Sequence, residues 1–422
     1  MVQVKEGFKV IVVGAGPAGL LIALMLAQKG ISVTVVEKGD EIDRNPRASF
    51  YNTPTIYELR RAGLMEDIMK NAFVPDGVSW RILESAGDGD KTKTFEMVCK
   101  LLADNPPGGE TNISLPLDEL LPLMAEHLGR HPSGKVLLSH EVLAVGQDTD
   151  KAWVDLKTPE GEKRLEADYV VGCDGAPSKV RRELFGNEFP GFTWDKQIVA
   201  TNVYYPKFKE FKGWTSSTFM IHPDHFPMIA QLANDGLLRI TYGEDAGLTK
   251  EQMRERLPWK FKQFVPGAPE PDEYEVVNFS PYKIHQRCAA KFRVGRVCLA
   301  ADAAHVCNPF GGMGLTGGLV DAGNLFDCLY GIATGQLDDS ILDKYSEIRI
   351  QKYNDIINPI SSSNIRRVWD PSPEAIKADP FFQAVQRAEK DEVFAEEMKK
   401  GLNAVMHDFT QYYKAPAVQN GA

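Results

Sequence analysis

The sequence lacks several patterns that would place it in a familiar class. Its six cysteines form no C-x-x-C pair, and several lie in apolar runs, so we predict buried free thiols in a reducing, cytoplasmic compartment. It has no internal repeat and no low-complexity tract, and we predict no metal site. The formal net charge of −10 argues against a surface that follows nucleic-acid phosphates and favours small-molecule partners.

Long uncharged runs are also scarce. Residues 10–27 carry no charge over eighteen positions, which is the length of a membrane span and also suggests a secretory signal. Three glycines and Pro17 interrupt this run, however, and the residues before it are not strongly basic. We therefore predict a buried strand, a tight turn and a buried helix here, and no membrane association.

The same N-terminal segment predicts a strand–helix–strand unit. Residues 9–14 (KVIVVG) are typical of a strand buried on both faces, as in a parallel sheet. Residues 17–30 predict a helix that is apolar nearly all round and closes at Gly30, and residues 32–38 predict the second strand. This is a βαβ unit of about the minimum length.

The turn of this unit predicts a dinucleotide site. Gly14, Gly16 and Gly19 form G-x-G-x-x-G between strand and helix, which permits a tight turn and lets the backbone approach a pyrophosphate at the helix N-terminus. Glu37 ends the second strand, 23 residues after Gly14, where a carboxylate can bind a ribose hydroxyl. An acid at this position favours FAD or NAD over NADP.

A second glycine-rich stretch, residues 299–318 (LAADAAHVCNPFGGMGLTGG), predicts the other half of the same cofactor site. Its apolar strand, residues 296–302 (RVCLAAD), ends in Asp302, which can accept hydrogen bonds from cofactor hydroxyls. Gly311, Gly312 and Gly314 let backbone amides face a ligand at a helix start, which suits the partial negative charge of a reduced flavin. Because NAD alone would not need a second, distant anion site, the two stretches together favour FAD.

The chain between these motifs changes character. Residues 135–175 predict an antiparallel meander that returns to the main sheet, and residues 191–280 predict a separate sheet. We predict an α/β fold: a Rossmann-like FAD-binding domain, with a mixed parallel sheet and an antiparallel meander, an inserted β-sheet substrate domain and C-terminal helices. The predicted boundaries are residues 1–75, 100–190 and 281–340 for the FAD-binding domain, 76–99 and 191–280 for the substrate-binding domain, and 341–422 for the C-terminal helical region.

Three motifs together resemble the fingerprints of the p-hydroxybenzoate hydroxylase-type (group A) FAD-dependent monooxygenases. They are the glycine turn with Glu37, residues 170–184 (VVGCDGAPSKVRREL) and residues 295–318. The resemblance spans roughly residues 8–365, and the motifs are specific in combination where each alone is not. It implies bound FAD with NADPH or NADH as a transient co-substrate.

The resemblance also implies individual cofactor residues. Asp174 and Arg181 match a segment in which an aspartate and an arginine help hold FAD and support NAD(P)H use. Arg47 lies in a stretch similar to one near the flavin, although a surface salt bridge is the alternative. The predicted cofactor-binding set is Gly14, Gly16, Ala18, Gly19, Glu37, Lys38, Arg47, Asp174, Arg181, Asp302, Pro309, Gly312, Gly314 and Leu315.

Two positions depart from the family pattern. Ala301 precedes Asp302 where relatives usually have glycine, and because a small residue remains we expect the site to survive. Leu117 stands where relatives often have a polar residue, and its side chain cannot hydrogen-bond the cofactor.

The resemblance implies an oxygenase mechanism. FAD reduced by NAD(P)H reacts with O2 to a flavin C4a-hydroperoxide, which transfers one oxygen atom to an aromatic or heteroaromatic small molecule. Since deprotonation activates a phenol, we expect a base or a cation near the flavin. Strand alternation places Arg239 and Thr241 on one face and Tyr242 on the other, so the candidates cannot all line one pocket. The predicted catalytic residues are Arg239, Tyr205, His225 and Pro309, the last through its carbonyl.

Other readings stay open at this point. An ordinary structural role is an alternative for each histidine and tyrosine, and we expect His305 to scaffold the flavin loop and Tyr282 and Arg287 to serve packing. The same flavin chemistry could perform epoxidation or rearrangement of a larger natural product in secondary metabolism. A flavin-dependent reductase or dehydrogenase and a scaffold without chemistry are further alternatives. The pattern leaves a monomer and a homodimer equally open.

Overall fold

The structure is a computed structural model that describes residues 3–43, 48–83, 95–102 and 112–414. The N-terminal apolar strand lies at the centre of a six-stranded sheet, where it pairs in parallel with a neighbour on each side. Because both faces of this sheet are covered, its strands consist of continuous apolar runs. The strand order is β17 (Arg293–Val294), β18 (Val297–Leu299), β11 (Tyr169–Gly172), β1 (Lys9–Val13), β2 (Ser32–Val36) and β7 (Gly134–Leu137).

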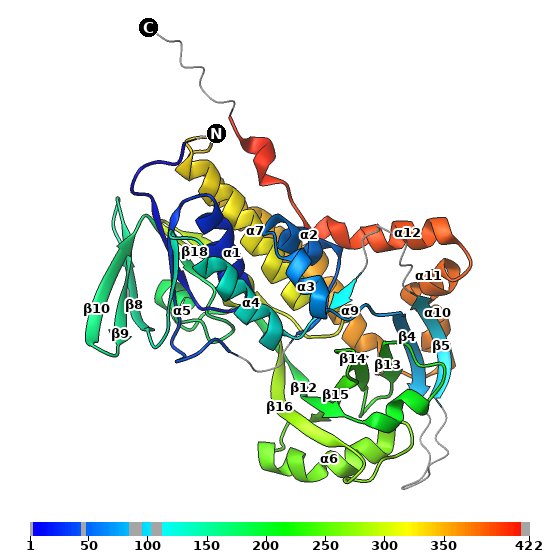
Figure 1. Ribbon diagram of the computed structural model, residues 1–422. Coiled ribbons are helices and arrows are strands. Elements are labelled where there is room, and N and C mark those ends of the chain that lie inside the picture. Colours follow the sequence, from blue (N-terminus) through cyan, green and yellow to red (C-terminus); the bar gives the residue numbers. More distant parts are fainter. Residues whose placement is uncertain (1–2, 44–47, 84–94, 103–111, 415–422) are drawn as a thin grey trace.

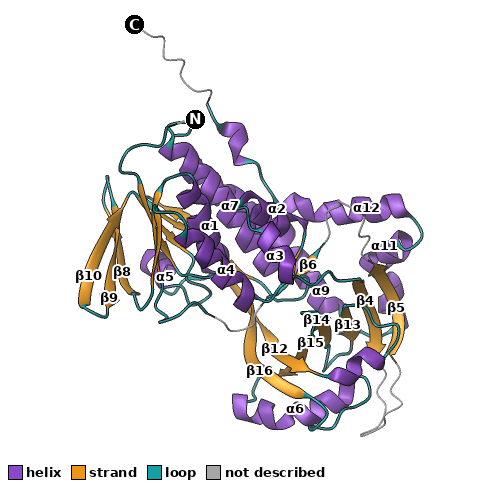
Figure 2. Ribbon diagram, viewed as in Figure 1, coloured by secondary structure: helices purple, strands orange, loops and turns teal. Residues whose placement is uncertain are grey.

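Helices cover one face of this sheet and an antiparallel meander covers the other (Figure 2). The first helix is buried along residues 18–27, which explains why its sequence is apolar all round. None of the helices in the described part of the chain is long and apolar enough to cross a membrane. The helices are α1 (Pro17–Gln28), α4 (Leu117–Gly129) and α7 (Met313–Ala333), and the meander is β8 (Glu141–Gln147), β9 (Ala152–Thr158) and β10 (Gly161–Ala167).

A second, eight-stranded sheet forms the other lobe, at the lower right of Figure 1. Helix α6 (Lys250–Phe264) packs on one of its faces, and the opposite face meets the nucleotide-binding lobe through Phe310. The strand order is β19 (His305–Val306), β16 (Glu275–Cys288), β12 (Gly191–Tyr204), β15 (Leu237–Asp245), β14 (Met228–Gln231), β13 (Ser217–Ile221), β4 (Gly77–Leu83) and β5 (Phe95–Leu102).

The C-terminal helices cover both lobes, because α8 packs on α7 and α11 packs on β5. β16 runs as one strand across the sequence-based boundary at residue 281, and we keep the division into three parts as a proposal. These helices are α8 (Ile341–Lys352), α9 (Asn358–Arg367), α10 (Pro373–Ala378), α11 (Pro380–Ala388) and α12 (Glu392–Lys400), with a π-helical turn (Tyr353–Ile357) joining α8 to α9. The remaining elements are β3 (Phe50–Tyr51), β6 (Ile113–Ser114), α2 (Thr53–Arg61), α3 (Met65–Asn71) and α5 (Lys179–Phe185).

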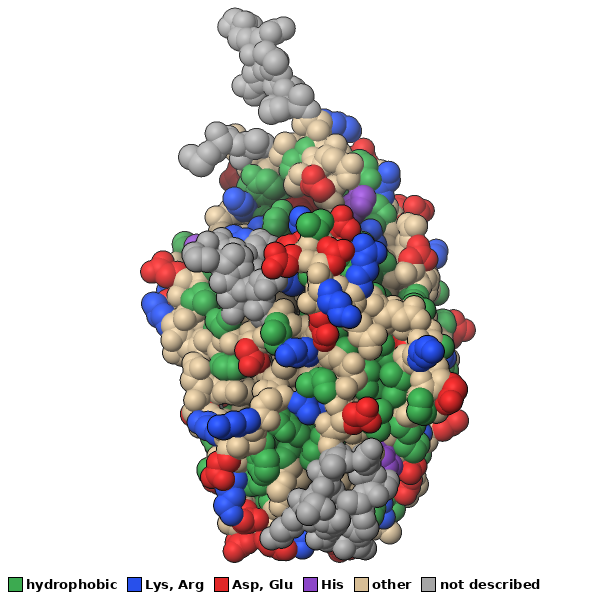
Figure 3. Space-filling view, turned by 90° about the vertical axis from the view of Figure 1, so that its right-hand side faces the viewer, with side chains coloured by type: hydrophobic (Ala, Val, Ile, Leu, Met, Phe, Trp, Pro, Cys, Tyr) green, Lys and Arg blue, Asp and Glu red, His purple; other side chains and the backbone are tan. Residues whose placement is uncertain are grey.

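The predicted fold class is confirmed in its main parts: a parallel sheet around β1, an antiparallel meander, an inserted sheet and C-terminal helices. The side of the molecule that carries α10 to α12 shows basic and acidic side chains interspersed (Figure 3). On the described part of that face the charges therefore do not gather into a basic track.

Candidate active site

The turn between β1 and α1 is built for close backbone approach. Gly14 has φ +102°, and a Cβ at this position would lie 2.5 Å from the carbonyl oxygen of Cys173. A Cβ on Gly19 would lie 2.1 Å from the carbonyl oxygen of Gly14. The following helix begins at Gly16 with no side-chain cap and no acidic residue in its first turn. Its first amides are thus left for an outside acceptor such as a pyrophosphate.

Glu37 braces this turn from the end of β2. Its carboxylate accepts hydrogen bonds from the amides of Ala15 and Gly39, both at 2.9 Å. A carboxylate offers about four acceptor positions, so it retains capacity for a ribose hydroxyl. The neighbouring Lys38 is exposed beside it. The geometry therefore suits the predicted ribose contact.

Asp174 and Arg181 both act on backbone groups. Asp174 accepts hydrogen bonds from the amides of Lys179 (2.6 Å) and Val180 (3.1 Å) and so caps α5. Arg181 is only 5% exposed and donates to the carbonyl of Ala303 at 2.9 Å. This contact ties α5 to the turn that carries Asp302, so any influence of Arg181 on a cofactor there passes through that turn.

The turn before Asp302 is strained. Ala301 has φ +56°, a left-handed conformation that costs a residue with a Cβ about 1–2 kcal/mol. Its amide donates a hydrogen bond to the buried carboxylate of Asp321 at 3.0 Å. A hydrogen bond to a charged group contributes about 1.5–3 kcal/mol, enough to offset the strain. The turn forms with alanine, and it leaves Asp302 exposed.

A second uncapped helix start lies at the Pro309–Gly312 loop. The amide of Gly312 donates to the carbonyl of Pro309 at 3.2 Å, and α7 then begins with neither a side-chain cap nor an acidic residue in its first turn. Gly314 and Leu315 in this turn are partly exposed. Two uncapped helix N-termini, with carboxylates beside them, fit a group that has both a pyrophosphate and a ring that becomes anionic. The residues present therefore fit FAD.

Two further sequence-based expectations concern this lobe. Leu117 is 5% exposed and packs in the core at the start of α4, as a residue without hydrogen-bonding capacity should. Arg47 lies outside the described residues, so its predicted place near the flavin stays a prediction.

The inner face of the eight-stranded sheet is the face opposite α6, which meets the nucleotide-binding lobe. It carries two polar side chains, those of Arg239 and Tyr282, and small residues separate them. Arg239 pairs across β12 with Asn202 and donates to its side-chain oxygen at 2.6 Å. Tyr282 lies on the same face, on the far side of a row of small residues. Opposed residues in a sheet share a face, which makes this row the floor between them. The row is Ala200, Thr241 and Ser280.

The flavin-side loop reaches this same face. The ring of Phe310 lies 6.2 Å from that of Phe219 and 5.9 Å from that of Phe226, measured between centroids. Phe219 is in register with Met228, which in turn opposes Thr241, so all three share the face of Arg239. The loop that carries Pro309 and Phe310 thus packs against the sheet face that carries Arg239, and a catalytic role for Pro309 and Arg239 stays a prediction.

Tyr282 shares the sheet face of Arg239, a neighbour that the sequence did not reveal. We expected packing, but its side chain is 40% exposed. Burial nevertheless raises its pKa to about 12, against an opposing effect of Arg239. Burial likewise lowers the pKa of Arg239, whereas Tyr282 and Asp118 raise it. Only the pairing of β16 with β12 could have revealed this neighbour.

The structure places two of the predicted catalytic residues on the side of the sheet that faces α6, opposite to Arg239. Tyr205 is 3% exposed, and its hydroxyl donates to the carbonyl of Pro266 at 3.0 Å, within the cluster under α6. His225 has its Nδ1 3.2 Å from the buried ammonium of Lys260 on α6. Neither shares a space with Arg239. Tyr242 also packs under α6, which confirms the predicted alternation.

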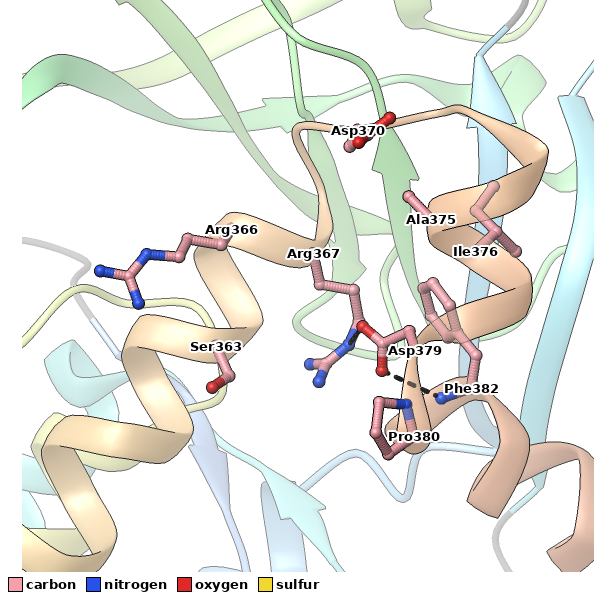
Figure 4. A pocket seen from close by; sticks show the side chains of 9 residues that line it. All are labelled: Ser363, Arg366, Arg367, Asp370, Ala375, Ile376, Asp379, Pro380 and Phe382. Carbon is pink, nitrogen blue, oxygen red and sulfur yellow. Dashed lines mark hydrogen bonds and ion pairs between the residues drawn. The ribbon is translucent and has the colours of Figure 1, made fainter.

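A cavity of about 340 Å³ lies apart from the cofactor cradle, between α9, α10 and α11 (Figure 4). Arg367 crosses it to Asp379 at 2.8 Å, while Arg366 points away. Asn364, which accepts a hydrogen bond from Arg367, donates to the carbonyl of Phe310 in the flavin-side loop at 3.4 Å. Its lining, which includes none of the glycine turns, is Ser363, Arg366, Arg367, Asp370, Ala375, Ile376, Asp379, Pro380 and Phe382.

The cradle and the facing sheet define a class of protein: a flavoprotein in which one lobe carries the residues that fit FAD and a second lobe packs a sheet face against it. A family model described as "FAD binding domain" matches residues 7–358, and the chain belongs to this family. The resemblance to p-hydroxybenzoate hydroxylase-type monooxygenases is thereby confirmed.

Known relatives match nearly the whole chain. Para-nitrophenol 4-monooxygenase of Pseudomonas sp. (strain WBC-3) is 36% identical over 378 residues, which are 89% of this chain and 91% of that protein. 6-Hydroxy-3-succinoylpyridine 3-monooxygenase of Pseudomonas putida (strain DSM 28022 / S16) is 35% identical over 373 residues, 88% and 91% of the two chains. The crystal structure of p-nitrophenol 4-monooxygenase from Pseudomonas putida DLL-E4 has a TM-score of 0.84 at 34% identity, and the match covers 94% of this chain and 98% of that one.

The chain is therefore an FAD-dependent monooxygenase that hydroxylates an aromatic or heteroaromatic small molecule, with reduced nicotinamide and O2 as co-substrates. When bound, FAD carries the reducing equivalents and activates the oxygen. The protein's own contribution is to hold the ring, exclude water and place charge at the substrate.

Proposed function

We propose that the substrate is a single-ring phenol or hydroxypyridine, oxygenated at the carbon para to its hydroxyl, where a polar substituent sits. The names of two relatives support this: oxygenation falls at position 4 of para-nitrophenol and at position 3 of 6-hydroxy-3-succinoylpyridine. In each molecule that carbon lies opposite the ring hydroxyl and carries the substituent. The observation that carries the proposal is the inner sheet face, where Arg239 and Tyr282 flank a floor of small side chains.

The two polar side chains have different tasks in this proposal. Arg239 stays cationic at neutral pH and stabilises the phenolate form, which is the electron-rich form that accepts oxygen. Tyr282, with its pKa raised to about 12 by burial, stays neutral and donates a hydrogen bond to a substrate oxygen. In the proposal, the substrate ring lies over the small side chains of Ala200, Thr241 and Ser280, which separate Arg239 from Tyr282.

The fate of the substituent follows from atom balance. When the attacked carbon carries a nitro group, the oxygen joins that carbon and nitrite departs with the electron pair of the C–N bond, which leaves a quinone. When the carbon carries hydrogen, the proton is lost instead and a hydroquinone forms. Nitrite release therefore reports attack at the para carbon.

The test uses FAD-loaded protein with para-nitrophenol, 6-hydroxy-3-succinoylpyridine, unsubstituted phenol and meta-nitrophenol. NADH and NADPH consumption, nitrite and product mass are measured together. We expect the para-substituted compounds to stimulate nicotinamide oxidation, with one nitrite released per para-nitrophenol consumed. Equal turnover of meta-nitrophenol would contradict the para rule. Turnover of multi-ring natural products alone would favour epoxidation or rearrangement.

We further propose a cytoplasmic location and either a monomer or a homodimer. The six cysteines are all unpaired in the structure, which suits a reducing compartment. Light scattering of the FAD-loaded protein distinguishes the two oligomeric states.

A further inference from the structure

A buried carboxylate lies directly behind the turn that presents Asp302. Asp321 lies on α7, three residues after Gly318, and is fully buried. One of its oxygens accepts from the amide of Ala301 at 3.0 Å and from Nε2 of His305 at 2.8 Å. The other accepts from Nε of Arg349 at 2.6 Å. Arg349 and His305 hold the pKa of this carboxyl below its usual range despite its burial, so it stays ionised.

One turn earlier on the same helix, Gly318 leaves room for the side chain of Ala301. A Cβ on Gly318 would lie 2.7 Å from the Cβ of Ala301 and 3.3 Å from its Cα. The first separation is below any real carbon–carbon contact, whereas the second needs a shift of only a few tenths of an ångström. Helix α7 therefore contacts the left-handed turn at two points. The carboxylate of Asp321 accepts the hydrogen bond of the Ala301 amide, and the methyl group of Ala301 lies in the space beside Gly318.

We infer that Asp321 and Gly318 are positioning residues that allow an alanine to take the place of glycine in this turn and so keep Asp302 aimed at FAD. The inference rests on the proposed contact between Asp302 and FAD. It states that the methyl group of Ala301 fits in this turn because Gly318, which faces it, has no side chain. It also explains how a departure from the family pattern leaves the turn intact.

The test measures FAD affinity of flavin-stripped protein by fluorescence titration, together with the melting temperature. We expect Gly318→Ala to raise the Kd for FAD at least tenfold. The double variant Ala301→Gly/Gly318→Ala should restore it to within threefold, because the atom 2.7 Å away is gone. Gly331→Ala is the matched control: it lies on α7 far from the turn, and its Cβ would meet Leu337 at 2.5 Å. It should lower the melting temperature with less than a twofold change in Kd.

A second pair of variants tests the carboxylate. Asp321→Asn should weaken FAD binding at least tenfold in the natural background and at most threefold with Ala301→Gly, because glycine needs no help to adopt a left-handed turn. An equal loss in both backgrounds would mean that Asp321 acts through the fold as a whole, and would overturn its assigned role.

Asp302→Ala separates this inference from the proposal beneath it. If it leaves FAD affinity unchanged, the contact between Asp302 and FAD is wrong and the inference falls with it. If Asp302→Ala weakens binding while Gly318→Ala does not, or while the double variant fails to recover, the inference alone is overturned.

Discussion

The cofactor cradle and the substrate face of this hydroxylase are made from different parts of the chain. The cradle consists mainly of backbone groups, which belong to tight glycine turns and two uncapped helix starts. Carboxylate side chains hold some of its amides in place. The substrate face consists of side chains from β12, β15 and β16, strands that come together only through long-range pairing. The backbone turn at Gly14 and Gly19 has no room for an added Cβ, whereas a site made of side chains tolerates their exchange and so can change its substrate.

The largest effect is expected where the backbone has no space at all. Gly19→Ala places a Cβ 2.1 Å from the carbonyl oxygen of Gly14, and neither backbone segment can move away without opening the sheet. We expect the purified protein to contain less than a tenth of the natural flavin content by absorbance. Gly129→Ala, with no atom within 4 Å of its Cβ, is the control and should retain flavin. Full flavin content in Gly19→Ala would show that the cradle is not made by this turn.

A substitution on the substrate face should separate catalysis from cofactor binding. Arg239→Met removes the cation of the inner face but leaves the glycine turns untouched. We expect kcat/KM for the phenol to fall about 100-fold, which corresponds to about 2.7 kcal/mol of transition-state stabilisation. The Kd for FAD should stay within twofold, and Arg239→Lys should recover part of the loss. A parallel loss of FAD affinity would break the division between the two regions.

A smaller effect is expected at the neighbouring hydroxyl. Tyr282→Phe removes one hydrogen bond, so kcat/KM should fall about tenfold. Because burial raises the pKa of Tyr282 to about 12, the hydroxyl stays protonated, and the ratio of natural to variant rates should stay constant from pH 7 to 10. Tyr205→Phe, on the opposite face, should leave kcat/KM unchanged. A ratio that decreases from pH 7 to pH 9 would indicate that Tyr282 ionises in that range.

The smallest effect concerns the strained alanine. Ala301→Gly removes a left-handed conformation that costs about 1–2 kcal/mol, but it also makes the unfolded chain more flexible by about 0.4–1 kcal/mol. We expect the free energy of unfolding to rise by about 0–1.6 kcal/mol in a urea titration with unchanged FAD affinity. A marked destabilisation would show that the methyl group of Ala301 stabilises the turn by packing against Gly318.

Much of the cradle could be predicted because its parts are local. The G-x-G-x-x-G turn, Glu37 and the second glycine stretch are each short, and the backbone geometry they need restricts which residues can stand there. The interior position of Arg181 and the strain at Ala301 could not be predicted in this way. The position of Arg181 depends on its contact with Ala303, 122 residues further along the chain. The strain at Ala301 is held by Asp321 of α7, the helix that packs behind the turn.

The sequence by itself determined the fold class, the cofactor and the type of chemistry, because glycine spacing and strand–helix alternation encode local backbone conformation. Only the tertiary structure decided which polar side chains share the substrate face. Alternation correctly separated Arg239 from Tyr242, but it could not assign Tyr205, His225 or Tyr282 to a side. The register between β12, β15 and β16 sets that assignment, and register arises from packing of the whole sheet against α6 on one face and the nucleotide lobe on the other.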